Sequence, residues 1–343
     1  MQESAFVHPV KYSSEKQGQY IQQWQNDGFL LLDDLFEASC FSKALAQVNE
    51  VFPADLPYAK VVDLASKADF GSAGILEFPC RFQEINLLTL DLRLLELTKA
   101  LLGTSDIRLI QADVWNKYGS EKSFSASDNR DQRMHMDYGN NTMLHPPIWE
   151  EPEAVACIIS FDDTEKTGGG TSFVPREGEE DAAYQFPYVL MPGMNGYPWI
   201  NNRTDELAYF KEKDPKLYQF RCELYKREKI AVYKPGSVLI YRHDLWHRGT
   251  PVNPGAVRRV QNIGFRRHDC EWVTTWNPGW VREMYDPDTY VERLFPILTV
   301  DQRSALGFPA PGHPYWTQTS FAACKARWEP MGMDMSPYRP AKR

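Results

Sequence analysis

The sequence predicts a mainly β protein with flanking helices, and three observations support this fold class. Between residues 107 and 267, short apolar and β-branched runs are separated by Gly and Pro, the pattern of a β-sandwich or β-barrel. Residues 1–105 are instead mainly helical in pattern. The aromatic content, with 18 Phe, 17 Tyr and 10 Trp, suits a β-rich body. Because helical and strand-like segments are segregated along the chain, an alternating α/β fold is not expected.

The N-terminal region, residues 1–105, is predicted to form a helical layer against a sheet. A polar-rich helix is expected over residues 15–28, and it leads into an apolar run at 29–32 that is typical of an early strand. Between residues 87 and 102, leucines recur in alternating steps of three and four, which is the spacing of one helix face. Gly103 follows this run, where a helix end is expected.

The central region, residues 106–268, is predicted to hold the β core. Its expected strands cover residues 107–115, 154–161, 171–175, 230–233, 237–241 and 258–267. The polar tract 120–132 has no apolar periodicity and is expected to be an exposed loop. Residues 176–229 are too long for an ordinary loop, so we expect them to carry structure of their own, including a helix over 209–224.

Two interpretations of the 176–229 insertion stay open: a lid over the site, and a peripheral decoration or dimer contact. The tail, residues 269–343, is rich in Pro and Trp and is expected to wrap back over the body. The whole chain, 1–343, is therefore predicted to be a single domain.

Composition limits the possible partners. The formal net charge is −8 and no long basic run is present, which argues against a nucleic-acid partner. The six cysteines show no CxxC pair or zinc spacing, which fits reduced thiols in a cytoplasmic protein. No apolar run has the length of a membrane span, and no signal segment is evident, so a membrane partner is not expected.

A possible metal site starts at His135 and Asp137. If this segment is a strand, side chains two residues apart face the same side, so both can reach one ion. His247 would add a second imidazole, which completes the facial set that leaves open positions on a non-haem Fe(II). An H-x-D pair by itself is more often an ordinary surface or turn pair.

A competing interpretation takes His243 and His247 as a variant of the H-E-x-x-H zinc motif, with Asp244 in place of Glu. That motif requires a helix, so that both histidines share one face. Here a strand-like apolar run leads into the motif, and Gly249 and Pro251 follow it, so no helix of useful length fits. We therefore expect His243 to be a structural residue or one that supports the ligands.

If the metal supports an oxidation that uses a dicarboxylate co-substrate, a fixed cation is needed to bind the carboxylate that lies away from the metal. An arginine can bind this carboxylate with two parallel hydrogen bonds. Both Arg258 and Arg259 begin the strand that follows His247, and residue spacing alone leaves the choice between them open.

Several motifs taken in order resemble the phytanoyl-CoA dioxygenase family of Fe(II)/2-oxoglutarate-dependent oxygenases, over residues 18–268. These motifs are the H-x-D pair, the glycine-rich run 168–175, the Lys-Pro-Gly-Ser-Val run 234–238, the Trp-His-Arg-Gly run 246–249 and Arg258. The resemblance implies a double-stranded β-helix, the cupin-like jelly roll, with an N-terminal helical layer. It also implies oxidoreductase activity with Fe(II), 2-oxoglutarate and O2 as cofactor and co-substrates.

Carried over by position, the resemblance makes His135, Asp137 and His247 the iron ligands and favours Arg258 over Arg259 for the co-substrate. Gln111, Lys117, Tyr118, Thr142 and Thr171 are the further residues expected to seat the co-substrate or line its pocket. The expected reaction is hydroxylation of an unactivated C–H bond, with release of succinate and CO2. The carboxylate of Asp137 argues against halogenation, because related halogenases lack it.

The substrate cannot be named from the sequence. No basic cluster suggests a CoA phosphate site, so a small-molecule metabolite or natural product is preferred, bound by a monomer or homodimer. Two alternatives stay open: a cupin-like metalloenzyme that does not use 2-oxoglutarate, such as an isomerase or another dioxygenase, and a non-catalytic jelly-roll binding protein. Two departures from the family bear on substrate placement: the long gap between His135 and His247, and Gly249 where some relatives have Ser.

Overall fold

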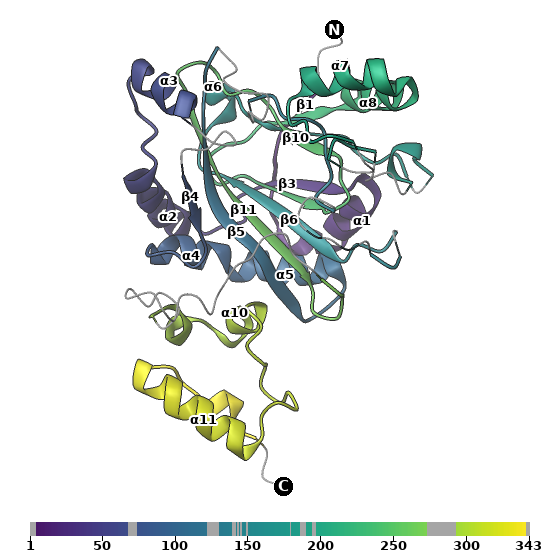
Figure 1. The fold of residues 1–343 in the computed structure, drawn as a ribbon. Coiled ribbons are helices and arrows are strands. Elements are labelled where there is room, and N and C mark those ends of the chain that lie inside the picture. The colour runs from purple at the N-terminus through teal and green to yellow at the C-terminus, as the bar shows by residue number, and fades with distance from the viewer. Residues whose placement is uncertain are drawn as a thin grey trace.

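Two β-sheets and a set of helices make up the protein in the computed structural model (Figure 1). The structure describes residues 5–67, 74–121, 130–138, 142, 144, 146–148, 150–178, 180–185, 190–193, 197–272 and 293–340. Most of the loop predicted at 120–132 lies outside these residues. None of the described helices is long and apolar enough to cross a membrane.

The larger sheet has the strand order β2-β3-β9-β6-β11-β5-β4, and its long strands β5, β6 and β11 are antiparallel. Its strands are β2 (Val10–Lys11), β3 (Phe29–Asp33), β4 (Ile75–Glu77), β5 (Ile107–Tyr118), β6 (Ala154–Ser160), β9 (Val238–Arg242) and β11 (Val257–Arg267). The smaller sheet has the order β1-β8-β7-β10, formed by β1 (Ala5–Val7), β7 (Thr171–Phe173), β8 (Lys229–Ala231) and β10 (His247–Gly249).

The helices come mainly from the two ends of the chain and from the 176–229 insertion. The α-helices are α1 (Gln17–Asp27), α2 (Ala38–Val51), α3 (Tyr58–Lys67), α4 (Gln83–Thr89), α5 (Leu92–Leu102), α6 (Thr164–Thr167), α7 (Arg203–Lys213), α8 (Pro215–Arg227), α10 (Val300–Ala305) and α11 (Gln318–Trp328). Short 3-10 helices cover Ser14–Lys16, Ala182–Tyr184, Phe295–Ile297, Glu329–Met331 and Ser336–Tyr338.

Two hydrophobic cores lie on the two faces of the larger sheet. Because successive side chains of a strand point to opposite faces, β9 contributes to both cores. Val238 and Ile240 pack in the outer core with α1, α2, α4 and α5, whereas Leu239 and Tyr241 pack in the inner core, which also contains residues of the smaller sheet. Tyr241 is therefore directed toward the space between the sheets, where the candidate site lies.

The single helix predicted over residues 87–102 is wrong, because two helices cover this stretch. α4 ends at Thr89, and the Asp91 side chain accepts hydrogen bonds from the backbone N–H groups of Arg93 (2.9 Å) and Leu94 (3.2 Å). This is an N-cap, which starts a new helix without interrupting the leucine spacing. Gly103 ends α5 in the left-handed conformation, as expected.

The prediction that the N-terminal region is helical and the central region forms the strands is also only partly correct. The predicted early strand is β3, which pairs with β9, but β1 and β4 from the same N-terminal region join the two sheets as well. Each has three residues, too few to show a two-residue period. Their pairing partners are far away in sequence, so the local pattern gives no sign of them.

Two α-helices, α7 and α8, cover the described stretch 203–227 of the 176–229 insertion, where one helix was predicted over 209–224. The break falls at Asp214 and Pro215. The Asp214 side chain accepts a hydrogen bond from the Leu217 backbone N–H at 3.0 Å, and Pro215 occupies the first turn of α8. Proline is favoured there because the first-turn N–H has no partner within the helix.

The C-terminal region divides into two parts. α10 docks on α5, where Lys99 and Asp301 pair at 3.0 Å and the Gln302 amide donates to the Leu90 carbonyl at 2.7 Å. α11 and the residues after it, yellow in Figure 1, lie beyond α10. Their buried side chains form a separate aromatic and methionine cluster made of Trp316, Phe321, Trp328, Met333, Met335 and Tyr338.

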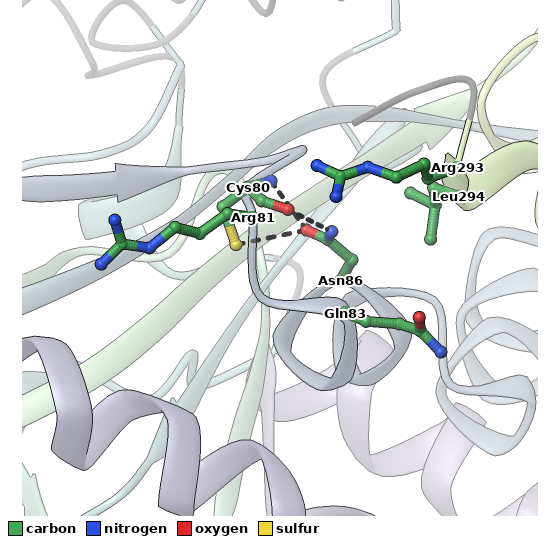
Figure 2. Close-up of a pocket in the computed structure, with 6 residues that line it drawn as sticks. All are labelled: Cys80, Arg81, Gln83, Asn86, Arg293 and Leu294. Atoms are coloured by element: carbon green, nitrogen blue, oxygen red, sulfur yellow. Dashed lines mark hydrogen bonds between the residues drawn. The ribbon is translucent and has the colours of Figure 1, made fainter. Parts of the chain in front are cut away.

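A small pocket lies over the start of α4. The Asn86 amide donates to the Cys80 carbonyl at 2.7 Å and accepts from the Cys80 N–H at 2.9 Å, which fixes the turn before the helix. Figure 2 shows this pair with Arg81 and Arg293 on either side. The pocket is lined by Cys80, Arg81, Gln83, Asn86, Arg293 and Leu294, none of which belongs to the metal centre described next.

Candidate metal centre

The two histidines predicted as ligands are brought together by backbone pairing. The segment before Met136 runs antiparallel beside β10, and His135 and His247 exchange backbone hydrogen bonds of 2.9 and 2.8 Å. The extended pairing holds only at His135, because the chain bends at Asp137. There the N–H groups of Asp137 and Tyr138 both donate to the His243 carbonyl, at 3.0 and 3.2 Å.

His135, Asp137 and His247 form a buried three-residue cluster. One potential ligand atom from each lies within 4.8 Å of the others, and His247 Nε2 is 3.6 Å from Asp137 Oδ1. The two imidazole rings have centroids 4.3 Å apart. Two nitrogen donors and one carboxylate oxygen on one side of an ion are the donor set that suits a non-haem Fe(II) with open positions. The residues present therefore fit iron.

Both imidazoles are oriented by backbone carbonyls. The Nδ1 atoms of His135 and His247 lie 3.1 Å from the Arg133 carbonyl and 3.0 Å from the Leu245 carbonyl. A carbonyl oxygen only accepts, so each Nδ1 donates its proton and each Nε2 keeps a free lone pair. Burial, followed by the nearby His247 and Arg133, lowers the pKa of His135 well below its usual value, which keeps this ring neutral and able to bind a metal.

Tyr241 supports the carboxylate of the cluster. Its hydroxyl donates to Asp137 Oδ2 at 3.0 Å and lies 3.3 Å from His247 Nε2. Burial and the neighbouring Asp137 raise the pKa of Tyr241 well above its usual value, so the hydroxyl keeps its proton. The sequence analysis missed this residue, although the two-residue alternation along its strand would have placed it on the same face as Leu239.

The 176–229 insertion lies directly behind the metal segment. Arg221 of α8 donates to the Met134 carbonyl at 2.5 Å and pairs with Glu206 of α7 at 2.9 Å, and the side chains of this ion pair are fully buried. The Tyr225 hydroxyl accepts from the Met134 N–H at 2.9 Å and donates to Glu206. The backbone on both sides of Met134 is thus fixed by the insertion, a role that neither open interpretation included.

Arg258 and Arg259 lie on opposite faces of β11 and have different partners. Arg259 faces the helices, where it binds both carboxylate oxygens of Asp162 and donates to the Phe52 carbonyl. Arg258 pairs with Lys117 across the strands and is buried, yet within the described residues its guanidinium makes no hydrogen bond or ion pair, and its Nε has no partner. Burial lowers the pKa of Arg258. An uncompensated buried cation is costly, which fits a binding site for an anionic group.

The surroundings of Arg258 include the glycine-rich run and Tyr233. A Cβ on Gly169, which has a φ of +74°, would lie 2.6 Å from a Val252 methyl and 3.3 Å from the Arg258 Cγ, so only glycine fits against this arginine. The Tyr233 hydroxyl donates to Thr171 Oγ1 at 2.9 Å. Tyr233 also interacts electrostatically with Arg258 and with Tyr241.

Lys117 and Tyr118, two other residues predicted to seat the co-substrate, lie on opposite faces of β5. The Lys117 ammonium donates to the carbonyls of Arg130 and Thr250, at 3.0 and 3.1 Å, so it joins the two segments that carry the ligands. Tyr118 is next to Lys117 on the strand and therefore faces the helices, where its hydroxyl accepts from Asn116 at 2.8 Å.

Gln111 and Thr142 lie on two other segments of the chain. Gln111 pairs with Gly264, Gly264 with Ala156, and Ala156 with Tyr241 across neighbouring strands, so Gln111 and Tyr241 face the same side of the sheet. The Gln111 amide donates to Asp113 at 2.9 Å. Thr142 is buried beside Tyr138, and its hydroxyl accepts from the Leu144 N–H at 3.2 Å.

The helix required by the zinc-motif interpretation is absent from the described segment at His243. β9 ends at Arg242, a turn follows, and β10 begins at His247, which confirms the expectation that no helix forms here. His243 is buried beside the cluster and is not part of the three-residue group. Burial lowers the pKa of His243.

No family model matches the chain, and no curated protein matches it in sequence. Several solved structures are similar to it. EctD from S. alaskensis with bound Fe shares 14% identity over 80% of this chain and 87% of that chain, with a TM-score of 0.49. The epimerase SnoN in complex with Fe3+, alpha ketoglutarate and nogalamycin RO shares 13% identity, over 74% and 85% of the two chains, with a TM-score of 0.45. The alpha ketoglutarate dependent carbocyclase SnoK shares 13% identity, over 79% and 90%, with a TM-score of 0.46.

Proposed function

We propose that the protein is an Fe(II)- and 2-oxoglutarate-dependent dioxygenase that hydroxylates an unactivated C–H bond of a small-molecule metabolite or natural product. The observation that carries this proposal is the buried set of His135, Asp137 and His247, together with the buried Arg258, whose guanidinium has no hydrogen-bond or ion-pair partner among the described residues. The first feature suits a metal with open positions, and the second suits a carboxylate on a co-substrate.

The wider assignment belongs to the same proposal. We place the chain in the phytanoyl-CoA dioxygenase family and take the two sheets as the halves of a jelly roll, in one domain. The faces that pack in the inner core would enclose the metal between the sheets. We further propose a cytoplasmic enzyme that acts as a monomer or homodimer, without a nucleic-acid or membrane partner.

In this proposal, the protein holds iron through His135 Nε2, His247 Nε2 and one oxygen of Asp137. Tyr241 donates to the other oxygen of Asp137, which leaves the first oxygen free for the metal. The carbonyls of Arg133 and Leu245 keep both rings in the tautomer that binds a metal. A metal held by these three side chains alone would keep positions open for 2-oxoglutarate and O2.

Arg258 would pair with the 5-carboxylate of 2-oxoglutarate. The guanidinium offers two parallel N–H donors, and its burial makes the pair strong because water is excluded. Thr171 and Tyr233 lie beside it and offer further hydroxyl groups. When bound, iron and 2-oxoglutarate supply the oxidising chemistry, in which O2 is reduced, 2-oxoglutarate becomes succinate and CO2, and one oxygen atom enters the substrate C–H bond.

The test measures Fe(II) binding under anaerobic conditions, 2-oxoglutarate binding to the iron-loaded protein, and succinate release after O2 is admitted. We expect one Fe(II) per chain, and we expect His135→Ala and Asp137→Ala to abolish metal binding and succinate release. His313→Ala, in an exposed loop, is the matched control and should behave as the wild type. Succinate release that persists in either ligand variant would contradict the proposal.

The same measurements separate the two alternatives. Iron binding without any consumption of 2-oxoglutarate would indicate a metalloenzyme of another type, such as an isomerase. A wild-type protein that binds no metal would indicate a non-catalytic binding protein.

A further inference from the structure

His243 is a buried imidazole without a hydrogen-bond partner. His243 is 1% exposed, and within the described part of the chain neither Nδ1 nor Nε2 has a hydrogen-bond partner. Most buried polar side chains in proteins are hydrogen-bonded, and a buried polar group without a partner destabilises the folded state. Two unpaired nitrogens on one ring therefore indicate that something else binds there.

The ring lies beside the candidate metal ligands. Its own backbone carbonyl accepts from Asp137, and its side chain interacts electrostatically with Asp137 and His247. Among the described residues, the potential metal-binding group contains only His135, Asp137 and His247. The nitrogens of His243 are thus close to the site of reaction but are not part of the ligand set.

Two aromatic rings surround this imidazole. Tyr138 meets it edge-on at 5.5 Å with an interplanar angle of 73°, and Trp272 does so at 5.6 Å and 72°. The Tyr138 and Trp272 rings are 6.2 Å apart. The three side chains come from the segment after the H-x-D pair, the end of β9 and the segment after β11, so they converge from distant parts of the sequence.

The charged groups next to His243 already have partners. Asp244 accepts hydrogen bonds from Arg242 at 2.8 Å and from Arg176 at 3.0 Å, and these arginines hold the pKa of Asp244 below its usual value despite burial. The cluster of His243, Tyr138 and Trp272 thus offers aromatic surface and an imidazole whose two nitrogens have no partner among the described residues. An imidazole that carries one proton presents one donor and one acceptor, which matches a hydroxyl or a carboxamide.

We propose that His243, Tyr138 and Trp272 form the substrate-recognition site, and that they bind a neutral hydroxyl or carboxamide group carried on an aromatic or apolar skeleton. This inference rests on the proposed function, because it assumes that the substrate approaches the metal cluster. His243 binds the polar group, and the two aromatic side chains pack against the skeleton. A ligand without the polar group leaves the imidazole unpaired and loses affinity.

The test uses five probes of one shape: benzyl alcohol, benzamide, toluene, benzylammonium and benzoate. Binding is measured anaerobically by calorimetry, on protein loaded with Fe(II) and 2-oxoglutarate. We expect the wild type to bind benzyl alcohol and benzamide about 10-fold or more tighter than the other three, as the loss of one hydrogen bond to a buried group predicts. His243→Phe should lose this preference, and His243→Gln, which keeps a donor and an acceptor, should recover part of it.

Three outcomes would overturn the inference: binding of none of the five probes, tightest binding of toluene or a charged probe, or an unchanged preference in His243→Phe. If His243→Phe does not fold, the wild-type ranking and the His243→Gln variant still decide the question. The iron and 2-oxoglutarate content of each protein is measured in the same samples. A wild type that holds neither would show failure of the proposed function, whereas a loaded wild type with the wrong ranking would show failure of this inference alone.

Discussion

His135 and His247 lie directly opposite each other on neighbouring extended segments, and their backbones exchange hydrogen bonds of 2.9 and 2.8 Å. The separation of the two imidazoles is therefore set by backbone pairing as well as by side-chain packing. A site held in this way needs little rearrangement to bind an ion. It also means that the side chains can be removed without removing the contacts that join the two segments.

We expect Fe(II), or Mn(II) as a redox-silent substitute, to raise the melting temperature of the protein. A ligand that binds only the folded state stabilises it by about 2.7 kcal/mol at a concentration 100 times its Kd. His135→Ala should abolish the shift but remain folded, because the backbone pair with His247 is retained. Thermal unfolding with and without metal checks this, and a chelator should reverse the shift. An equal shift in His135→Ala would place the metal elsewhere.

Tyr241→Phe is expected to weaken metal binding by about 10- to 100-fold, since it removes the hydrogen bond that orients Asp137. Tyr233→Phe is the matched control, because its lost hydroxyl binds Thr171 and not a ligand. Titration with Fe(II) under anaerobic conditions measures both variants. Equal metal affinity in wild type and Tyr241→Phe would show that Asp137 is held by other contacts.

Arg258 and Arg259 are expected to respond in opposite ways to substitution. Arg259→Ala leaves Asp162 buried without its partner and should lower the free energy of unfolding by about 3–5 kcal/mol. Arg258→Met removes a buried cation that has no ion-pair partner among the described residues, so the unfolding free energy should not fall. Denaturant unfolding measures both.

The affinity for 2-oxoglutarate separates the same two residues. It should fall steeply in Arg258→Met and remain near the wild-type value in a conservative Arg259→Lys variant. An Arg258→Met protein with unchanged affinity for 2-oxoglutarate would exclude this arginine as the co-substrate anchor.

The insertion is expected to control metal binding from behind the site. Arg221→Ala leaves Glu206 buried without a cation, with the Tyr225 hydroxyl as its remaining donor, and frees the Met134 carbonyl. We therefore expect a loss of about 3–5 kcal/mol in stability and weaker metal binding. The double variant Glu206→Leu, Arg221→Met should regain stability, because it removes both buried charges. Unfolding and Fe(II) titration check this, and Lys226→Ala on the exposed face of α8 is the control.

The grouping of His135, Asp137 and His247 could be expected from the sequence only by combining several motifs. The H-x-D pair and the apolar strands have short-range patterns, whereas the distal histidine was assigned through the order of motifs that resembles the phytanoyl-CoA dioxygenase family. The choice between Arg258 and Arg259 could not be made from residue spacing, because a shift of one residue in strand register exchanges the two faces. In the structure, Arg258 pairs with Lys117 and Arg259 with Asn116, which places the two arginines on opposite faces of β11. The role of Arg258 toward the co-substrate stays a proposal.

The support around the cluster could not be predicted for a different reason. Glu206 and Arg221 are charged residues in polar helices, which ordinarily indicates a solvated surface. In the structure both are fully buried, where they form an ion pair and Arg221 also donates to the Met134 carbonyl. Tyr241 lies in an apolar strand and gives no sign of its contact with Asp137. Such roles depend on long-range pairing, which no local pattern contains.

Asp113 makes stability depend on pH in a direction that can be tested. Burial raises the pKa of Asp113 to about 7, although the amides of Gln111 and Asn262 donate to its two oxygens. In the unfolded chain this pKa is about 3.8, so between about pH 4 and pH 7 the folded state binds the extra proton. The group's stabilising contribution is therefore complete below about pH 4 and is lost as the pH rises through 7.

Asp113→Asn has no proton to lose, so the wild type should become less stable relative to this variant as the pH rises. The difference in unfolding free energy should change by roughly 3 kcal/mol between pH 5 and pH 8, at about 1.4 kcal/mol per pH unit up to the folded pKa. Denaturant unfolding of both proteins at several pH values measures it, and all other titrating groups cancel in the comparison. A difference that stays constant with pH would mean that Asp113 is ionised throughout, because stronger hydrogen bonding from its neighbours then offsets the cost of burial.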